Sequence, residues 1–268
     1  MRTPNKLQPD DAGAWGGQLI SISDLMAGLL FVFIVIVLVF AFKLNKATEE
    51  KQSAVAEFQN TREIRKGMLE AIKNALLAGG LDTTTFFIDP ETGVLSLRER
   101  ILFPSGSTEL NPSGDVALTI LADALVKVLP CYAGEPDSPH PDGCPDNAET
   151  GRIEAVFIEG HTDSIPVSPS SPFRNNWDLS TARAIKVFEE MTRRKPALDT
   201  LKNTASQPLF GISGYADRRP YGRDRTSNST ESGRAMNRRI DVRFIMSYPR
   251  DPDAVVDANA ALKKSEMK

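Results

Sequence analysis

The longest hydrophobic segment of the chain lies near its N-terminus, where residues 25–42 are eighteen consecutive positions without a charge. As a helix, this segment would be about 27 Å long, close to the thickness of the hydrocarbon core of a bilayer. It predicts a transmembrane helix over residues 19–42. A buried helix of a soluble core and a cleaved signal peptide ending near Ala41 are the alternatives. The segment is apolar on all sides and longer than a usual signal core, which favours the transmembrane interpretation.

A charged, helix-prone segment follows over residues 43–80. Its apolar residues recur at intervals of three or four, as on one face of a helix: Val55, Phe58, Ile64, Met68, Ile72 and Leu76. This spacing predicts an amphipathic linker helix that ends at the glycines of positions 79 and 80. The linker is either a connector between two copies of the chain or a solvated spacer.

Beyond residue 83 the pattern alternates between strand and helix periodicity. Strands are predicted over 84–89, 94–103, 152–159, 208–215 and 239–246, and helices over 111–129 and 176–194. Strands that alternate with helices and end in a closing strand pair are typical of an α/β fold, an α+β sandwich with helices on one face of the sheet.

These patterns divide the chain into five parts. They are a short cytoplasmic N-terminus (1–18), a transmembrane helix (19–42), a helical periplasmic linker (43–80), the α/β domain (81–248) and a flexible tail (249–268). Lysine and arginine are balanced on the two sides of the helix, so the positive-inside rule does not orient it. The orientation rests on the periplasmic character of the C-terminal domain.

Composition narrows the possible functions. The formal net charge of −3 gives no general basis for nucleic-acid binding. Two histidines and two cysteines make a Cys/His zinc site improbable. No nucleophile with a base, metal-ligand cluster or pair of catalytic acids is evident, so the sequence predicts neither an enzyme nor a resident cofactor.

The two cysteines, Cys131 and Cys144, enclose a segment rich in proline, glycine and aspartate that has no apolar periodicity. A disulfide would constrain this loop, and it would place the domain in an oxidising compartment such as the periplasm. Two unrelated buried thiols are the alternative.

One acidic residue, Asp24, lies inside the predicted transmembrane helix. Helical spacing places it on one face with Ala27 and Gly28, which are small enough for close approach of another helix. A membrane carboxylate that alternates between a charged and a neutralised form can carry H⁺ or Na⁺. A helix cap or an interfacial residue is the alternative. Since one helix cannot form a channel, ion transport would require a partner.

Five ordered motifs in the C-terminal half resemble the OmpA-like peptidoglycan-binding family. They are FPSGS (103–107), EGHTD (159–163), NWDLSTARA (176–184), GYADRRP (214–220) and GRAMNRR (233–239). The resemblance implies that an aspartate and an arginine hold the diaminopimelate of the peptide stem, and the motifs assign these roles to Asp163 and Arg183. A carboxylate suits the ligand ammonium, and a guanidinium suits its carboxylate.

The same resemblance implies supporting roles for Thr162, Asn176 and one arginine of the last motif. Arg238 and Arg239 point to opposite sides of a strand, and Arg238 is the one assigned to the site. His161 is interpreted as structural.

Two further features are similar to the MotB-like stator branch. Residues 164–175 are longer than in simple outer-membrane members, and SDLM at 23–26 resembles the stator signature whose aspartate binds the translocated ion. The continuation AGLLFVFI (27–34) resembles the stator-type subunits of Zorya anti-phage defence systems, the ZorB group. A flagellar-type stator subunit and a passive wall tether are the alternatives.

The resemblance implies an inner-membrane protein with one span, a cytoplasmic N-terminus and a periplasmic C-terminal domain. Its implied partners are a MotA-like multi-span subunit (ZorA), a second copy of the chain and peptidoglycan. Apart from the translocated H⁺ or Na⁺, it implies no cofactor.

Overall fold

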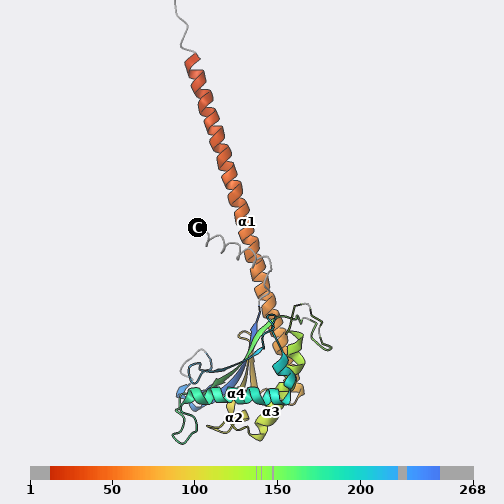
Figure 1. The fold of residues 1–268 in the computed structure, drawn as a ribbon. Helices are drawn as coiled ribbons and strands as arrows, with labels where there is room; N and C mark the ends of the chain where they lie inside the picture. The colour runs from red at the N-terminus through yellow and green to blue at the C-terminus, as the bar shows by residue number, and fades with distance from the viewer. Residues whose placement is uncertain (1–12, 137, 140, 147, 223–227, 248–268) are drawn as a thin grey trace, which may run out of the picture. The chain divides into compact units, whose positions relative to one another are not determined.

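The computed structural model describes residues 13–136, 138–139, 141–146, 148–222 and 228–247 (Figure 1). The predicted tail (249–268) and the first twelve residues of the predicted N-terminus (1–18) lie outside this description. The chain divides into two compact units, with the boundary between Ala56 and Glu57. Each unit is described separately.

The first unit consists of the N-terminal part of helix α1 (Gly13–Ala78). It contains one candidate membrane span, Asp24–Glu49. The large apolar side chains of residues 25–42 are exposed, from 41% for Val35 to 76% for Phe42. This exposure contradicts the alternative of a helix buried in a soluble core, because such a helix would hide these side chains.

The last turns of α1 belong to the second unit. Ile64, Met68, Ile72 and Leu76 are almost fully buried in its hydrophobic core. The core of the domain therefore includes part of the segment assigned to the linker and extends N-terminal of residue 81. An amphipathic face has the same spacing whether it packs on its own domain or on another copy, so the pattern alone does not distinguish the two.

The sheet of the second unit has five strands: β1 (Phe86–Asp89), β2 (Val94–Arg98), β3 (Ile153–His161), β4 (Phe210–Gly214) and β5 (Arg239–Met246). Their spatial order is β1-β2-β5-β3-β4, and only the β3–β4 pair is parallel among these strands. The parallel pair is joined through helix α4 (Asn176–Arg194), as a crossover between parallel strands requires.

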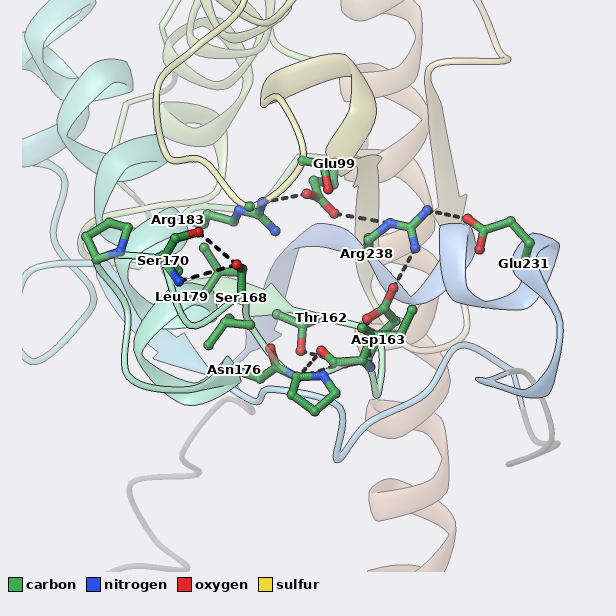
Figure 2. Close-up of a pocket in the computed structure, with 17 residues that line it drawn as sticks. Glu99, Thr162, Asp163, Ser168, Ser170, Asn176, Leu179, Arg183, Glu231 and Arg238 are labelled. Atoms are coloured by element: carbon green, nitrogen blue, oxygen red, sulfur yellow. Dashed lines mark hydrogen bonds and ion pairs between the residues drawn. The ribbon is translucent and has the colours of Figure 1, made fainter.

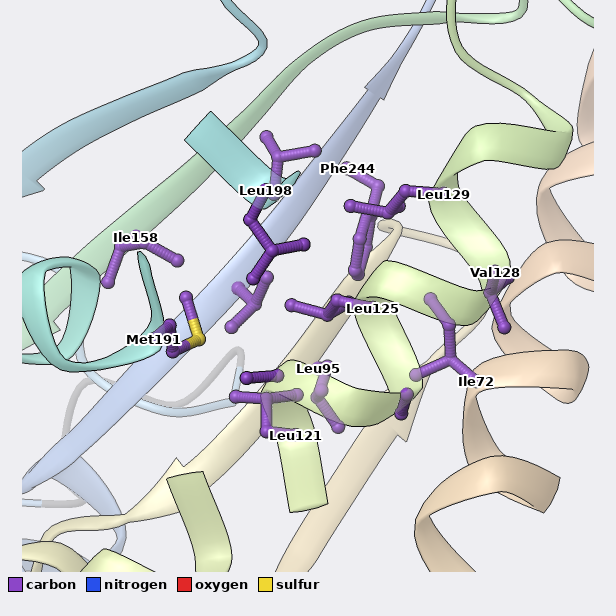
Figure 3. Close-up of a cluster of buried hydrophobic side chains, with 14 of the residues drawn as sticks. Ile72, Leu95, Leu121, Leu125, Val128, Leu129, Ile158, Met191, Leu198 and Phe244 are labelled. Atoms are coloured by element: carbon purple, nitrogen blue, oxygen red, sulfur yellow. The ribbon is translucent and has the colours of Figure 1, made fainter. Parts of the chain in front are cut away.

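Helices cover one face of this sheet. The buried side chains of β2, β3 and β5, including Leu95, Ile158 and Phe244, form one core with those of α3 (Pro112–Val128) and α4 (Figure 3). Short helices complete the unit: α2 (Glu99–Leu102), α5 (Glu231–Asn237), and the 3-10 turns η1 (Leu129–Cys131) and η2 (Pro196–Thr200). The structure thus confirms an α/β fold preceded by an apolar helix and a helical segment.

The other face of the sheet carries a buried polar network between β3 and β5. Arg243 donates two hydrogen bonds of 2.9 Å to Glu159, and Arg239 Nε lies 3.0 Å from both oxygens of Asp241. His161 Nε2 is 3.2 Å from Asp241 Oδ2, and burial lowers the pKa of this imidazole. Glu159, His161 and Asp241 could together approach a metal ion, but both carboxylates are already paired with guanidiniums. The arrangement gives His161 a structural position.

Two predicted helices begin where their capping residues indicate. Asn111 accepts a hydrogen bond from the backbone of Gly114 at the start of α3, and Asn175 accepts one from Asp178 at the start of α4. The predicted strand 94–103 is wrong at its end, because β2 stops at Arg98 and α2 follows. Residues 101–103 are three consecutive apolar positions, and so short a run fits the end of a strand and a single helical turn equally well.

The predicted disulfide between Cys131 and Cys144 is present, with a Cα–Cα distance of 5.7 Å. Replacing both residues by alanine is expected to lower the free energy of unfolding by about 3 kcal/mol, because the unfolded chain regains the entropy of the opened loop. Denaturation of the full chain in detergent, with and without reductant, measures this. Reductant should destabilise the wild type and leave the double variant unchanged; equal stability of the two oxidised proteins contradicts the prediction.

Close packing of β3 on α4 depends on Gly160. A β-carbon there would lie 1.9 Å from the backbone oxygen of Ser180. Gly160→Ala is therefore expected to cost about 3 kcal/mol of unfolding free energy, since the helix must move away from the sheet. Gly211→Ala is the matched comparison, because its nearest neighbour is the Phe157 ring, which can rotate. An equal loss in both variants, measured by denaturant unfolding, contradicts this account.

Candidate functional site

A pocket of about 640 Å³ opens at the carboxyl end of β3 (Figure 2). All five domain residues predicted from the motifs line it: Thr162, Asp163, Asn176, Arg183 and Arg238. They come from the end of β3, from α4 and from the junction of α5 with β5. The long segment after Asp163 forms another wall through residues 165–168 and 170–172. Asp163 and Arg238, which are 75 positions apart in the chain, are thus brought together.

Asp163 is held firmly at the floor of the pocket. Its Oδ1 accepts a hydrogen bond of 3.0 Å from the backbone of Ile165, and its Oδ2 accepts one of 2.5 Å from Arg238 Nη1. Asn176 Nδ2 donates to the backbone oxygens of Asp163 and Ile165, at 3.1 and 2.9 Å. The Thr162 hydroxyl also donates a hydrogen bond of 3.0 Å to the backbone oxygen of Asp163. Asn176 and Thr162 therefore orient the loop that presents the Asp163 carboxylate.

Arg183 is more enclosed than its predicted role suggests, since only 2% of the residue is exposed. Its Nε donates to the backbone oxygen of Ser107 at 2.9 Å, and its Nη2 lies 2.5 Å from Glu99 Oε1. The guanidinium is also 5.6 Å from the centre of the Phe103 ring. The motif at 103–107 therefore shapes the surroundings of Arg183, and burial lowers the pKa of its guanidinium.

The two neighbouring arginines of the last motif point in different directions. Arg238 lies in the pocket against Asp163, whereas Arg239 joins the polar network on the sheet through Asp241. Arg238 also donates to Glu231 at 2.9 Å. Burial tends to lower the pKa of Arg238, but its hydrogen bonds to Glu231 and Asp163 outweigh this and raise the pKa.

Two acidic residues of the pocket, Glu99 and Glu231, were not predicted from the sequence. Glu99 is 4% exposed at the start of α2, and burial raises the pKa of its carboxyl despite two adjacent guanidiniums. Glu231 begins α5 on the rim, and its hydrogen bond with Arg238 lowers its pKa. In the sequence, Glu99 lies four positions before the FPSGS motif, and none of the five motifs includes it.

The pocket therefore carries alternating charges over a short span: Arg183, Glu99, Arg238 and Asp163, with Glu231 at its edge. Such a set can bind a small group that carries both an ammonium and a carboxylate. The remaining predicted residue, Asp24, has an exposed side chain on α1 in the first unit and is not part of this pocket.

Comparisons with known proteins were made for the whole chain, and no family model matches it. Motility protein B of Bacillus subtilis (strain 168) is 36% identical over 87 residues, which are 32% of this chain and 28% of that protein. The chain is MotB-like in sequence. The aligned part is little more than a quarter of Motility protein B.

A second relative is similar over a greater length. Zorya protein ZorB of Escherichia coli (strain ATCC 8739) is 28% identical over 213 residues, covering 75% of this chain and 77% of that protein. Among solved structures, a MotB-like protein from Desulfovibrio vulgaris is similar with a TM-score of 0.48 and 20% identity, over 70% of this chain and 99% of that one.

Proposed function

We propose that the chain is a stator-type membrane subunit that binds peptidoglycan through its second unit and carries ions through its first. The observation that carries the proposal is the meeting of five motif residues from separate parts of the chain in one charged pocket (Figure 2). Similarity to Motility protein B supports it.

The ligand of the pocket is the peptide stem of peptidoglycan. The Asp163 carboxylate receives the ammonium of a diaminopimelate, and the Arg183 guanidinium receives the carboxylate on the same carbon. Thr162 and Asn176 fix the Asp163 loop, and Arg238 lies between the carboxylates of Glu99 and Asp163. This attachment gives the membrane unit a fixed point against which force can act.

The membrane unit works with partners. Residues 19–42 span the inner membrane, with residues 1–18 in the cytoplasm and the segments 43–80, 81–248 and 249–268 in the periplasm. Two copies lie within a ring of a MotA-like multi-span subunit, and Asp24 binds and releases H⁺ or Na⁺ at their interface. One charge that crosses 100 mV supplies about 2.3 kcal/mol, which drives movement of the ring.

The process that this motor serves is anti-phage defence of the Zorya type, with ZorA as the ring subunit. Support comes from the similarity to Zorya protein ZorB, which extends over 77% of that protein. A flagellar-type stator is the second candidate, because Motility protein B has the higher identity over its shorter alignment. A passive peptidoglycan tether would need neither Asp24 nor a ring partner.

Phage plating on cells with and without the complete native operon tests this function. A lower plating efficiency on cells with the operon is expected. Restoration of swimming in a flagellar stator-null strain, without protection from phages, would instead favour the second candidate.

A further inference from the structure

Glu99 occupies the centre of the charged pocket. Its backbone N–H donates a hydrogen bond of 2.9 Å to the backbone oxygen of Arg238, which fixes the start of α2 beside β5. One carboxylate oxygen lies 2.5 Å from Arg183 Nη2, and the other lies 3.5 Å from Arg238 Nε. Figure 2 shows this carboxylate between the two guanidiniums. An internal anion therefore already lies where a ligand carboxylate is expected.

The contacts of Arg183 restrict how a ligand can reach its guanidinium. The residue is 2% exposed, its Nε is bound to Ser107, and its Nη2 faces Glu99. A carboxylate that enters the pocket can reach this guanidinium only by sharing it with Glu99 or by displacing Glu99. Asp163, which is expected to bind the ammonium, is likewise paired in this state, with Arg238.

We propose that Glu99 is a built-in competitor for Arg183 and that ligand binding is an exchange of ion-pair partners. The inference rests on the proposed binding of peptidoglycan. The ligand carboxylate takes Arg183 from Glu99, while the ligand ammonium takes Asp163 from Arg238. The two released groups, Glu99 and Arg238, then pair with each other.

The exchange conserves charge within the pocket. Before binding, Arg183 pairs with Glu99, and Arg238 pairs with Asp163 and also with Glu231 at the rim. After binding, both arginines and both acids again have a partner of opposite charge, and the 3.5 Å between Glu99 and Arg238 requires only a small movement. A ligand with a carboxylate but no ammonium would displace Glu99 without releasing Arg238 from Asp163. Glu99 thus favours ligands that carry both charges.

Removing the competing charge tests the proposal. Glu99→Gln keeps the size of the side chain and an acceptor for Arg183, and it is expected to lower the Kd for a soluble disaccharide tripeptide ending in diaminopimelate by about tenfold. Glu99→Asp keeps a buried negative charge that reaches Arg183 less well, so a smaller gain in affinity is expected. Calorimetry on the full chain in detergent provides both values. Glu91→Gln, which removes the charge of an exposed ion pair with Arg62 away from the pocket, is the control and should leave the Kd unchanged.

Each result is decisive. Tighter binding by the folded variants supports competition. Unchanged or weaker binding, with the wild type still binding, overturns it and leaves Glu99 as a positioning residue for the two arginines. Loss of folding in both variants also overturns it, because Glu99 would then be structural. If the wild type binds neither the tripeptide nor sacculi, the proposed function itself fails, and this inference fails with it.

Discussion

Asp163→Asn is expected to weaken binding of the full chain to peptidoglycan sacculi by roughly a hundredfold, or about 3 kcal/mol. The substitution removes the charge that pairs with the ligand ammonium and keeps the shape of the side chain. The asparagine oxygen can still accept the hydrogen bond from Ile165, and Arg238 keeps Glu231 as a partner. The loop should therefore stay in place, and the loss should come from the charge alone. Co-sedimentation with purified sacculi over a range of protein concentrations measures it.

The matched control is Asp217→Asn, which removes a carboxylate from the nearby GYADRRP motif outside the pocket lining. Its binding should equal that of the wild type. If Asp163→Asn binds sacculi as well as the control does, the assignment of Asp163 to the ligand ammonium is wrong.

Arg183 is a less informative position for the same experiment. Removing a guanidinium that is 2% exposed leaves the buried Glu99 carboxylate without its nearest partner. Breaking a buried ion pair in this way costs about 3–5 kcal/mol of stability, so loss of binding by Arg183→Ala would mix unfolding with loss of contact. The enclosure of Arg183 makes Asp163 the better test of the site.

The sequence contained enough information to predict most of the fold. Helix α4 and strand β5 have the predicted bounds, because helical periodicity over 176–194 and alternation over 239–246 are local signals. Helix α5 was not predicted, since its seven residues contain few apolar positions from which to read a period. The burial of Ile72 in the domain core also depends on tertiary packing, which an amphipathic pattern does not specify.

The pocket was predictable only in part, for a similar reason. Asp163, Arg183 and Arg238 belong to recognisable motifs, and the structure places all three in one pocket. Glu99 belongs to no motif that assigns it a role, and its importance arises from its distances to two arginines that follow it by more than eighty positions in the chain. Motifs therefore indicated the groups that face the ligand, whereas the groups that compete with it became visible only in three dimensions.

Asp24→Asn is expected to abolish protection from phages in cells that carry the complete native operon. Asparagine keeps the shape of the side chain but cannot take up and release an ion, so the motor would lose its energy source. A charged carboxylate costs about 2.5–3.5 kcal/mol in the middle of a membrane and less near its edge, and neutralisation by H⁺ or Na⁺ removes this cost. Asp24 is at the beginning of the candidate span Asp24–Glu49. Plating efficiency, with membrane levels matched by immunoblot, gives the result.

Glu49→Gln is the matched control, since it neutralises the carboxylate at the opposite end of the same candidate span. It should protect as well as the wild type, because Glu49 lies beyond the predicted transmembrane helix 19–42, whereas Asp24 lies within it. Equal protection by Asp24→Asn and the control would make Asp24 a structural residue, and the ion-driven mechanism would fall while peptidoglycan binding could still stand. Loss of protection in both variants would indicate a general need for charge at the ends of the span. It would also contradict a specific ion-carrying role for Asp24. Only loss confined to Asp24→Asn supports ion transport, because only that result separates titration within the membrane from the anchoring of the helix.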